Sequence, residues 1–225
     1  MKVLIIYLTF CSTLQVCLAQ SIEDKLIKKM CNCLSAAISN KGELNDEKFD
    51  ACWSNDSLLI KEVEQYFSQN DSLNLDDETA YKFGKEYFEK NQIRFINECD
   101  AFYHFIDSAR YNFLNEVMPI KINIQIDSLT KEINEKQNNS ELFRLRGLNY
   151  FSLMKLKEAK EDFDKALSLP GANAQCLYFR GWIFEIWGRF DEAIADYKLA
   201  KESTGITYVD MLIAIADRKK REKNN

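Results

Sequence analysis

Seven cysteines and a single histidine are the residues of this 225-residue chain best suited to metal, redox or covalent chemistry. Five of the cysteines lie beyond residue 20, and two of these, Cys31 and Cys33, stand one residue apart within "KKMCNCLSAAI" at 28–38. Such a set suits a thiolate zinc site, a redox-active pair or structural disulfides. Which of these applies depends on the elements that carry the cysteines.

Cys31 and Cys33 fall in an amphipathic helical pattern, and helical geometry separates them. Each residue turns an α-helix by about 100°, so side chains two residues apart point about 200° from each other. The two cysteines lie at opposite edges of an apolar stripe formed by Ile22, Leu26, Ile27, Met30, Leu34, Ala37 and Ile38. Zinc sites usually use Cys-x₂₋₄-Cys pairs on turns, which is a different spacing. We therefore expect disulfides, with a zinc site and a redox pair as alternatives.

The four cysteines between residues 30 and 100 allow three disulfide pairings. A Cys31–Cys33 bond would need a distorted turn and is the least favoured. If the helix that carries Cys33 forms an antiparallel hairpin with the next helix, Cys33 and Cys52 lie at similar distances from the turn. This favours Cys33–Cys52 together with Cys31–Cys99.

The first twenty residues, "MKVLIIYLTFCSTLQVCLAQ", are typical of a secretory signal peptide. Lys2 precedes an apolar run, and Cys17-Leu18-Ala19 places small residues at the positions that a signal peptidase recognises. We expect cleavage after Ala19 and export to the periplasm or to the outside of the cell, with no membrane segment remaining. A membrane anchor and a lipid-attachment box at "LQVC" are alternatives. Export exposes the remaining cysteines to an oxidising compartment, which favours disulfides.

The other two residues suited to chemistry, Cys176 and His104, do not complete a catalytic set. Cys176 is expected to be a buried, inert thiol, with an intermolecular disulfide as the alternative. His104 lies among aromatic residues in "AFYHFID" and is expected to be partly buried. With one histidine and no glycine-rich phosphate loop, neither a Ser–His–acid nor a Cys–His site can be assembled. We therefore expect no enzyme, no cofactor and no bound metal, and the net charge of −5 argues against a nucleic-acid partner.

Composition and apolar periodicity predict an all-α protein. Only 7 Gly and 2 Pro occur in the chain, and long stretches repeat their apolar residues at helical spacing. Before residue 119, the aromatic residues also recur at helical spacing and are expected to form a core. We predict a disulfide-stapled helical domain over 20–118, with helical patterns near 21–39, 46–53, 57–69, 77–90 and 92–117.

The second half of the chain contains an internal repeat of 34 residues. "GLNYFSLMKLKEAKEDFDKALSL" at 147–169 is followed by "GWIFEIWGRFDEAIADYKLAKES" at 181–203. Equivalent positions hold the same residue classes in Gly147/Gly181, Tyr150/Phe184, Ala159/Ala193, Phe163/Tyr197 and Ala166/Ala200. This combination of a glycine, aromatics and alanines across two helices resembles the tetratricopeptide repeat family. The resemblance covers about 140–207 and implies an α-solenoid of paired helices.

The small residues of the repeat and its flanks support an α-solenoid independently. Glycine inside a helix costs about 1 kcal/mol relative to Ala, so Gly147 and Gly181 indicate that another helix comes close. Residues 119–139 carry isoleucines on one helical face and are expected to be a half repeat, with a short strand as the alternative. Residues 208–225 are expected to be a capping helix with a basic tail. The predicted solenoid thus has about two and a half units.

By resemblance to the family, the first helix of each repeat lines a groove that binds peptides. Exposed Tyr, Trp and Arg side chains often dominate such binding energy. The groove residues expected to contact a partner are Glu141, Arg144, Leu148, Phe151, Tyr178, Trp182 and Glu185. The alternative for Phe151 and Trp182 is that they pack against a neighbouring helix.

Four Asp-Ser-apolar triplets resemble the acceptor motif of an O-glycosylation system of some Gram-negative bacteria. The resemblance makes Ser57, Ser72 and Ser128 possible acceptors, while the fourth triplet, at Ser108, lies within a helical pattern. Helix capping by Asp and Ser is the alternative.

The sequence thus predicts a signal peptide over 1–19, a helical domain over 20–118, a half repeat over 119–139, two repeats over 140–207 and a capping helix over 208–225. The expected function is non-catalytic binding of a protein or peptide by an exported adaptor, scaffold or assembly factor. The alternative is a small-molecule or metal-binding N-terminal domain that the repeats support.

Overall fold

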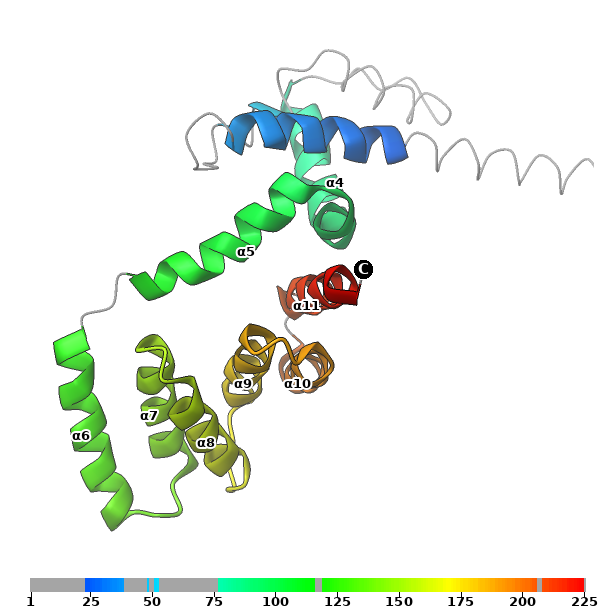
Figure 1. Cartoon of the computed structure of the whole chain (residues 1–225). Coiled ribbons are helices and arrows are strands. Elements are labelled where there is room, and N and C mark those ends of the chain that lie inside the picture. The colour runs from blue at the N-terminus through cyan, green and yellow to red at the C-terminus, as the bar shows by residue number, and fades with distance from the viewer. Residues whose placement is uncertain are drawn as a thin grey trace, which may run out of the picture. The chain divides into compact units, whose positions relative to one another are not determined.

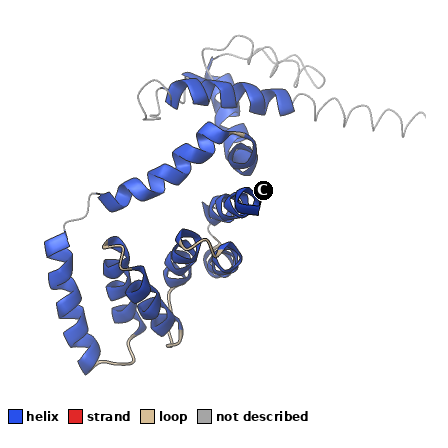
Figure 2. Cartoon of the chain, in the orientation of Figure 1, coloured by secondary structure: helices blue, strands red, loops and turns tan. Residues whose placement is uncertain are grey.

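The computed structural model of the chain describes residues 23–38, 48, 51–52, 77–115, 119–205 and 208–224. All regular structure in these residues is helical, which confirms the predicted fold class (Figures 1 and 2). The chain divides into two compact units, Met1–Phe105 and Ile106–Asn225, and each is described by itself. The division falls within helix α5 (Asp100–Asn115), whereas the sequence placed the domain boundary at 118.

Two helical hairpins form the centre of the second unit. The first consists of α7 (Ser140–Ser152) and α8 (Leu156–Leu167), and the second of α9 (Ala174–Ile186) and α10 (Phe190–Thr204). The helices within each hairpin pack on each other, and α8 also packs on α9 (Figure 1). This is the arrangement of a helical repeat solenoid.

Equivalent caps start the first helix of each hairpin. The Asn139 side chain accepts a hydrogen bond from the Glu141 backbone N–H, and the Asn173 side chain accepts one from Gln175. Asparagine is a preferred N-cap because its side-chain oxygen satisfies an amide that has no partner within the helix. The repeat therefore preserves the signals that start its helices as well as its apolar residues.

The two glycines of the repeat face aromatic rings from the second helix of their own hairpin. A Cβ atom on Gly181 would lie 2.8 Å from Tyr197 Cε1 and 3.2 Å from the Ala193 carbonyl oxygen. A Cβ atom on Gly147 would lie 2.7 Å from Phe163 Cε1. Glycine is used at these positions because a side chain there would overlap a ring that is fully buried.

Each hairpin is also closed by an Arg–Asp pair. Arg146 forms two hydrogen bonds with Asp162, and Arg180, which lies 34 residues later in the sequence, forms two with Asp196. The four N–O distances lie between 2.7 and 2.8 Å. Both aspartates are buried, so each carboxylate depends on its arginine for compensation.

Helix α6 (Pro119–Glu135) is joined to the first hairpin as that hairpin is joined to the second. Arg180 Nη1 reaches back to Asp164 in the preceding hairpin at 2.7 Å, and Arg146 Nη1 reaches Thr130 of α6 at 3.1 Å. Thr130 and Asp164 are 34 residues apart, and α6 packs on α7 as α8 packs on α9. This equivalence supports the predicted half repeat, and a helix occupies the segment for which a strand was the alternative.

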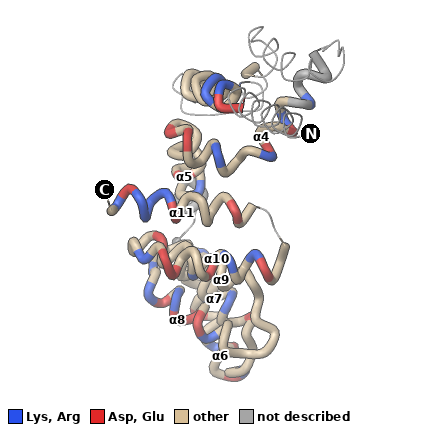
Figure 3. Tube along the Cα trace, turned by 90° about the vertical axis from the view of Figure 1, so that its right-hand side faces the viewer, with Lys and Arg blue, Asp and Glu red and all other residues tan. Residues whose placement is uncertain are grey.

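Helix α11 (Tyr208–Asn224) begins 34 residues after α9 and so continues the repeat. Val209, Leu212 and Ala216 pack against Phe184 and Tyr197 in one apolar cluster. The last turns of the helix carry the charged residues of the basic tail (Figure 3). An apolar first part with a charged end is what a helix that closes a repeat array requires.

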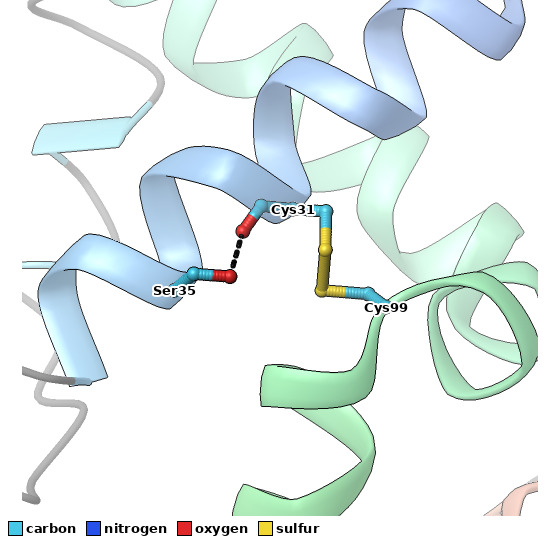
Figure 4. The surroundings of a disulfide bond; sticks show 3 residues. All are labelled: Cys31, Ser35 and Cys99. Atoms are coloured by element: carbon cyan, nitrogen blue, oxygen red, sulfur yellow. Dashed lines mark hydrogen bonds between the residues drawn. A yellow bond between two sulfur atoms is a disulfide. The ribbon is translucent and has the colours of Figure 1, made fainter.

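In the N-terminal unit, the helix over 23–38 and α4 (Asp77–Glu98) contribute fully buried apolar side chains. Disulfides join Cys31 to Cys99 and Cys33 to Cys52, the two pairs that the sequence favoured, with Cα–Cα distances of 5.4 and 5.7 Å. The helix itself stays regular at Cys31, whose carbonyl oxygen accepts a hydrogen bond from Ser35 Oγ (Figure 4). All four sulfurs are in disulfides, so none is left as a thiolate ligand for zinc.

Only parts of the remaining N-terminal predictions fall on described residues. Lys48, Ala51 and Cys52 are helical, in agreement with the pattern near 46–53. The signal peptide, the whole of 57–69, Ser57 and Ser72 lie outside the described residues.

We expect Gly181→Ala to lower the free energy of unfolding by about 1–3 kcal/mol, because the added methyl group meets backbone as well as the Tyr197 ring. Urea denaturation followed by circular dichroism measures the change. In the first repeat the three atoms nearest to the added methyl group all belong to the Phe163 ring, so Phe163→Leu should absorb part of the cost of Gly147→Ala, with a coupling of at least about 0.5 kcal/mol. An unchanged or higher stability of Gly181→Ala would contradict this account of the glycine.

The thiols of a chain lacking 1–19 should react in a fixed order. Cys176 is fully buried, and burial raises the pKa of its thiol to about 11, so the native protein should not react with a thiol reagent. In denaturant without reductant one thiol per chain should react, and after reduction five. Three or more reactive thiols before reduction would contradict the two disulfides.

Candidate functional site

The structure separates the seven predicted groove residues into an accessible and a buried set. Glu141 is exposed, and Arg144, Leu148 and Tyr178 are half-buried. Phe151, Trp182 and Glu185 are only 1, 3 and 3 % exposed. All seven lie on α7 and α9, the first helices of the two hairpins.

The part of α5 that belongs to the second unit contacts two of the three buried residues, Trp182 and Glu185. The guanidinium of Arg110 lies 4.8 Å from the centre of the Trp182 ring, and the Tyr111 ring meets Trp182 edge-on at 5.7 Å. Phe151 packs against Trp182 from the other hairpin at 5.0 Å. For Phe151 and Trp182 the structure therefore follows the packing alternative, and their expected exposure to a partner is corrected.

Glu185 is buried too, contrary to the expectation of a groove contact, because it is the centre of an ionic network. Arg110 donates from Nη1 and Nη2 to the two carboxylate oxygens of Glu185, at 3.1 and 3.0 Å. Lys219 of α11 donates to Glu185 at 2.9 Å and to Asp107 of α5 at 2.7 Å. The Tyr197 hydroxyl of α10 adds a hydrogen bond to Glu185 at 2.8 Å. The two positive charges of Arg110 and Lys219 thus balance the two negative charges of Glu185 and Asp107. Side chains from α5, α9, α10 and α11 meet at the Glu185 carboxylate.

The network keeps its charges in spite of burial. Burial alone would raise the pKa of Glu185, but the charges and hydrogen bonds of Arg110 and Lys219 outweigh it and hold this pKa below its ordinary value. Burial likewise acts to lower the pKa of Lys219, and the two carboxylates Glu185 and Asp107 raise it instead. For the Tyr197 hydroxyl, burial and the Glu185 charge both raise the pKa. At neutral pH the carboxylate, the ammonium and the neutral phenol therefore coexist.

The accessible set adjoins a cavity of about 490 Å³ at the other end of α9. Three aromatic side chains line it, Tyr178, Phe179 and Tyr208, and Tyr208 remains 42 % exposed. Asn173, Gln175 and Thr204 add polar groups. The remaining wall is formed by small or aliphatic residues, Ala174, Ala200 and Val209.

A polar contact links the first hairpin to this cavity. Arg144 of α7 donates to the side-chain oxygen of Gln175 at the cavity wall and is itself paired with Glu141. The Glu141 partnership keeps the pKa of Arg144 above its ordinary value. Because Gln175 is exposed and lines the cavity, a ligand there can contact an amide group as well as aromatic rings.

Sequence reasoning missed several residues of the cavity and of the ionic network, among them Tyr208 and Arg110. Tyr208 stands 34 residues after Ala174, so extending the repeat by one more helix would have identified it. Arg110 lies on α5, outside the repeat, and no pattern in the sequence points to it.

Elsewhere, the predicted glycosylation site Ser128 is exposed within α6. Asp127 and Ser128 lie well inside this helix, so N-capping does not explain that triplet. Among the described residues, no three His, Cys, Asp or Glu side chains gather as metal ligands, and no helix is long and apolar enough to span a membrane.

We expect Glu185→Gln to cost about 3 kcal/mol at pH 7, because it leaves buried cations with one carboxylate fewer. The folded-state pKa of Glu185 is lowered, so its contribution is complete above its ordinary value of 4.5 and is lost as the pH falls through the folded-state pKa. The stability of the wild type should therefore fall more steeply below about pH 4.5 than that of Glu185→Gln. Urea denaturation between pH 3 and 7 measures both.

A matched control for this prediction is Glu192→Gln, which removes an exposed carboxylate paired with Arg189 on the same hairpin. It should leave the free energy of unfolding unchanged within error. Equal effects of the two substitutions would contradict the central role of Glu185.

Comparison with protein families agrees with this geometry. The model of the tetratricopeptide repeat family matches residues 145–173 and 174–204, which contain most of the first hairpin and the whole of the second. No curated protein and no solved structure gives a significant match to the chain. The 34-residue spacing of caps, glycines and Arg–Asp pairs is the physical counterpart of the family match. Residues 145–204 are therefore two tetratricopeptide repeats.

Proposed function

We propose that this chain is an exported, non-catalytic protein that binds a segment of a protein partner at the cavity beside α9. The observation that carries the proposal is the cavity of about 490 Å³, whose wall includes Gln175 and Tyr178 of α9, the first helix of the second repeat. Its volume is within the range of about 300–1,000 Å³ that is usual for ligand sites. The chain would then act as an adaptor, scaffold or assembly factor.

The lining suggests which kind of segment would fit. The rings of Tyr178, Phe179 and Tyr208 suit an apolar or aromatic side chain, and aromatic residues commonly dominate binding energy at such surfaces. The polar groups of Gln175 and Thr204 suit the peptide backbone on either side of that anchor. We infer a short partner segment with one large apolar side chain flanked by polar residues.

Two features support the exported location. The first 19 residues have the composition of a signal peptide, and four of the remaining cysteines pair in two disulfides. Disulfides persist in oxidising compartments such as the periplasm and the cell exterior.

The test compares Tyr208→Ala with Trp187→Ala in a crosslinked pull-down from the native cell envelope. The two aromatic side chains are similarly exposed, at 42 and 39 %, but only Tyr208 lines the cavity. Partners captured by the wild type should fall at least about fivefold with Tyr208→Ala, a loss of about 1 kcal/mol, and remain with Trp187→Ala. The same partners at the same level in both variants would contradict the cavity as the binding site.

A further inference from the structure

Three residues of α5 meet the repeats as a bound helix would. Asp107, Arg110 and Tyr111 follow the spacing i, i+3, i+4, which places them on one face of the helix, and each contacts α9 or α11. The intervening residues Ser108 and Ala109 are exposed. Over residues 107–111, α5 thus presents one face to the repeats and leaves the other to solvent.

The surface that receives this helix face is formed by Trp182, Glu185 and Lys219. These residues occupy successive positions of the first helices, since Lys219 stands 34 residues after Glu185 and Trp182 lies one turn before Glu185. We call them the Trp182–Glu185–Lys219 surface. The Trp182 ring and the Glu185 carboxylate can both bind one guanidinium group. The Lys219 ammonium can bind a carboxylate.

Each charged residue on this face of α5 therefore meets a complementary group on the Trp182–Glu185–Lys219 surface. Arg110 donates to Glu185 from both terminal nitrogens while lying over Trp182, and Asp107 accepts from Lys219. Bidentate arginine–carboxylate pairs are geometrically selective, because lysine cannot reproduce the planar fork. The ligand that this surface selects is a helix with an acidic residue, an arginine three positions later and an aromatic residue directly after it.

The fit of α5 is incomplete at two buried polar atoms. Within the described part of the chain, Trp182 Nε1 and Arg110 Nε have no hydrogen-bond partner. A buried donor without a partner costs about 1–3 kcal/mol. A helix of the same pattern that also brings an acceptor near Trp182 Nε1 would recover part of this cost and would compete with α5.

We propose that the Trp182–Glu185–Lys219 surface is a docking site for a partner helix of the pattern Asp-x-x-Arg-aromatic, and that residues 107–111 occupy it in the same chain until such a helix displaces them. The site uses other residues than the cavity at Tyr208 and does not depend on the function proposed there. The helix that leaves stays attached, because α5 is continuous with the N-terminal unit.

The test uses a fluorescent peptide with the sequence of residues 104–115, "HFIDSARYNFLN", and the full-length chain. In the wild type, α5 competes with the peptide, so binding measured by anisotropy should be weak. Arg110→Glu places a carboxylate against Glu185 and should free the surface, which should tighten peptide binding at least about tenfold. A peptide that carries Glu at the position of Arg110 should not bind, and the control Arg189→Glu should behave as the wild type.

A second measurement on the wild type avoids any loss of folding in the variant. Carbodiimide should crosslink Lys219 to Asp107, because Lys219 Nζ lies 2.7 Å from Asp107 Oδ1. Excess peptide should replace this crosslink by a peptide adduct on Lys219, and the Glu-substituted peptide should not. The proposal is overturned if no peptide concentration diminishes the intramolecular crosslink. It is also overturned if the crosslink joins two chains, since the occupant would then be a second copy.

Discussion

The buried carboxylate of Glu185 is the constraint on which the end of the repeat array depends. A carboxylate enclosed in protein requires opposite charge and several donors, because desolvation otherwise costs several kcal/mol. Here the donors come from α5, α10 and α11 in the form of Arg110, Tyr197 and Lys219. Each of these helices is thereby held to α9 at one point, and a change at that point affects all of them.

The position of Glu185 in the repeat explains why this constraint arises only once. Its equivalent in the first repeat is Phe151, which is buried among aromatic rings, and its equivalent in α11 is Lys219. A repeat made only of apolar residues at this position would stack without requiring α5. The substitution of a carboxylate, matched by a lysine one repeat later and an arginine outside the repeats, gives the last hairpin a specific neighbour.

The first-helix side of the repeats is consequently used in two ways. Around Trp182 it is covered by α5, and around Tyr178 it stays open as a cavity lined by three aromatic rings. The closed part gains specificity from charge, while the open part offers apolar area and a few amide groups. Binding sites commonly combine these two elements, and in this protein they lie on successive turns of the same helices.

Local and periodic features were determined by the sequence alone. The 34-residue spacing of Gly147 and Gly181 indicates close helix packing because only glycine fits beside a buried ring, and the family match agrees with it. The angle between side chains two residues apart on a helix, which is a local property, argued against a Cys31–Cys33 bond. The choice of Cys33–Cys52 with Cys31–Cys99 needed the further assumption of an antiparallel hairpin, and the structure has these two pairs. The all-α fold class followed from apolar periodicity in the same way.

What lies against each helix was decided only by the tertiary structure. Apolar periodicity shows which side of a helix avoids water, but it does not name the element that covers that side. Glu185 was therefore expected to be open, and Trp182 to be either open or packed against an unnamed helix. Arg110, 75 residues before Glu185, contacts them both. The segment around Arg110 carries no repeat signature, so its contact with the repeats depends on the path of the chain between them. That path, together with the cavity between the starts of α9 and α11, exists only in the folded molecule.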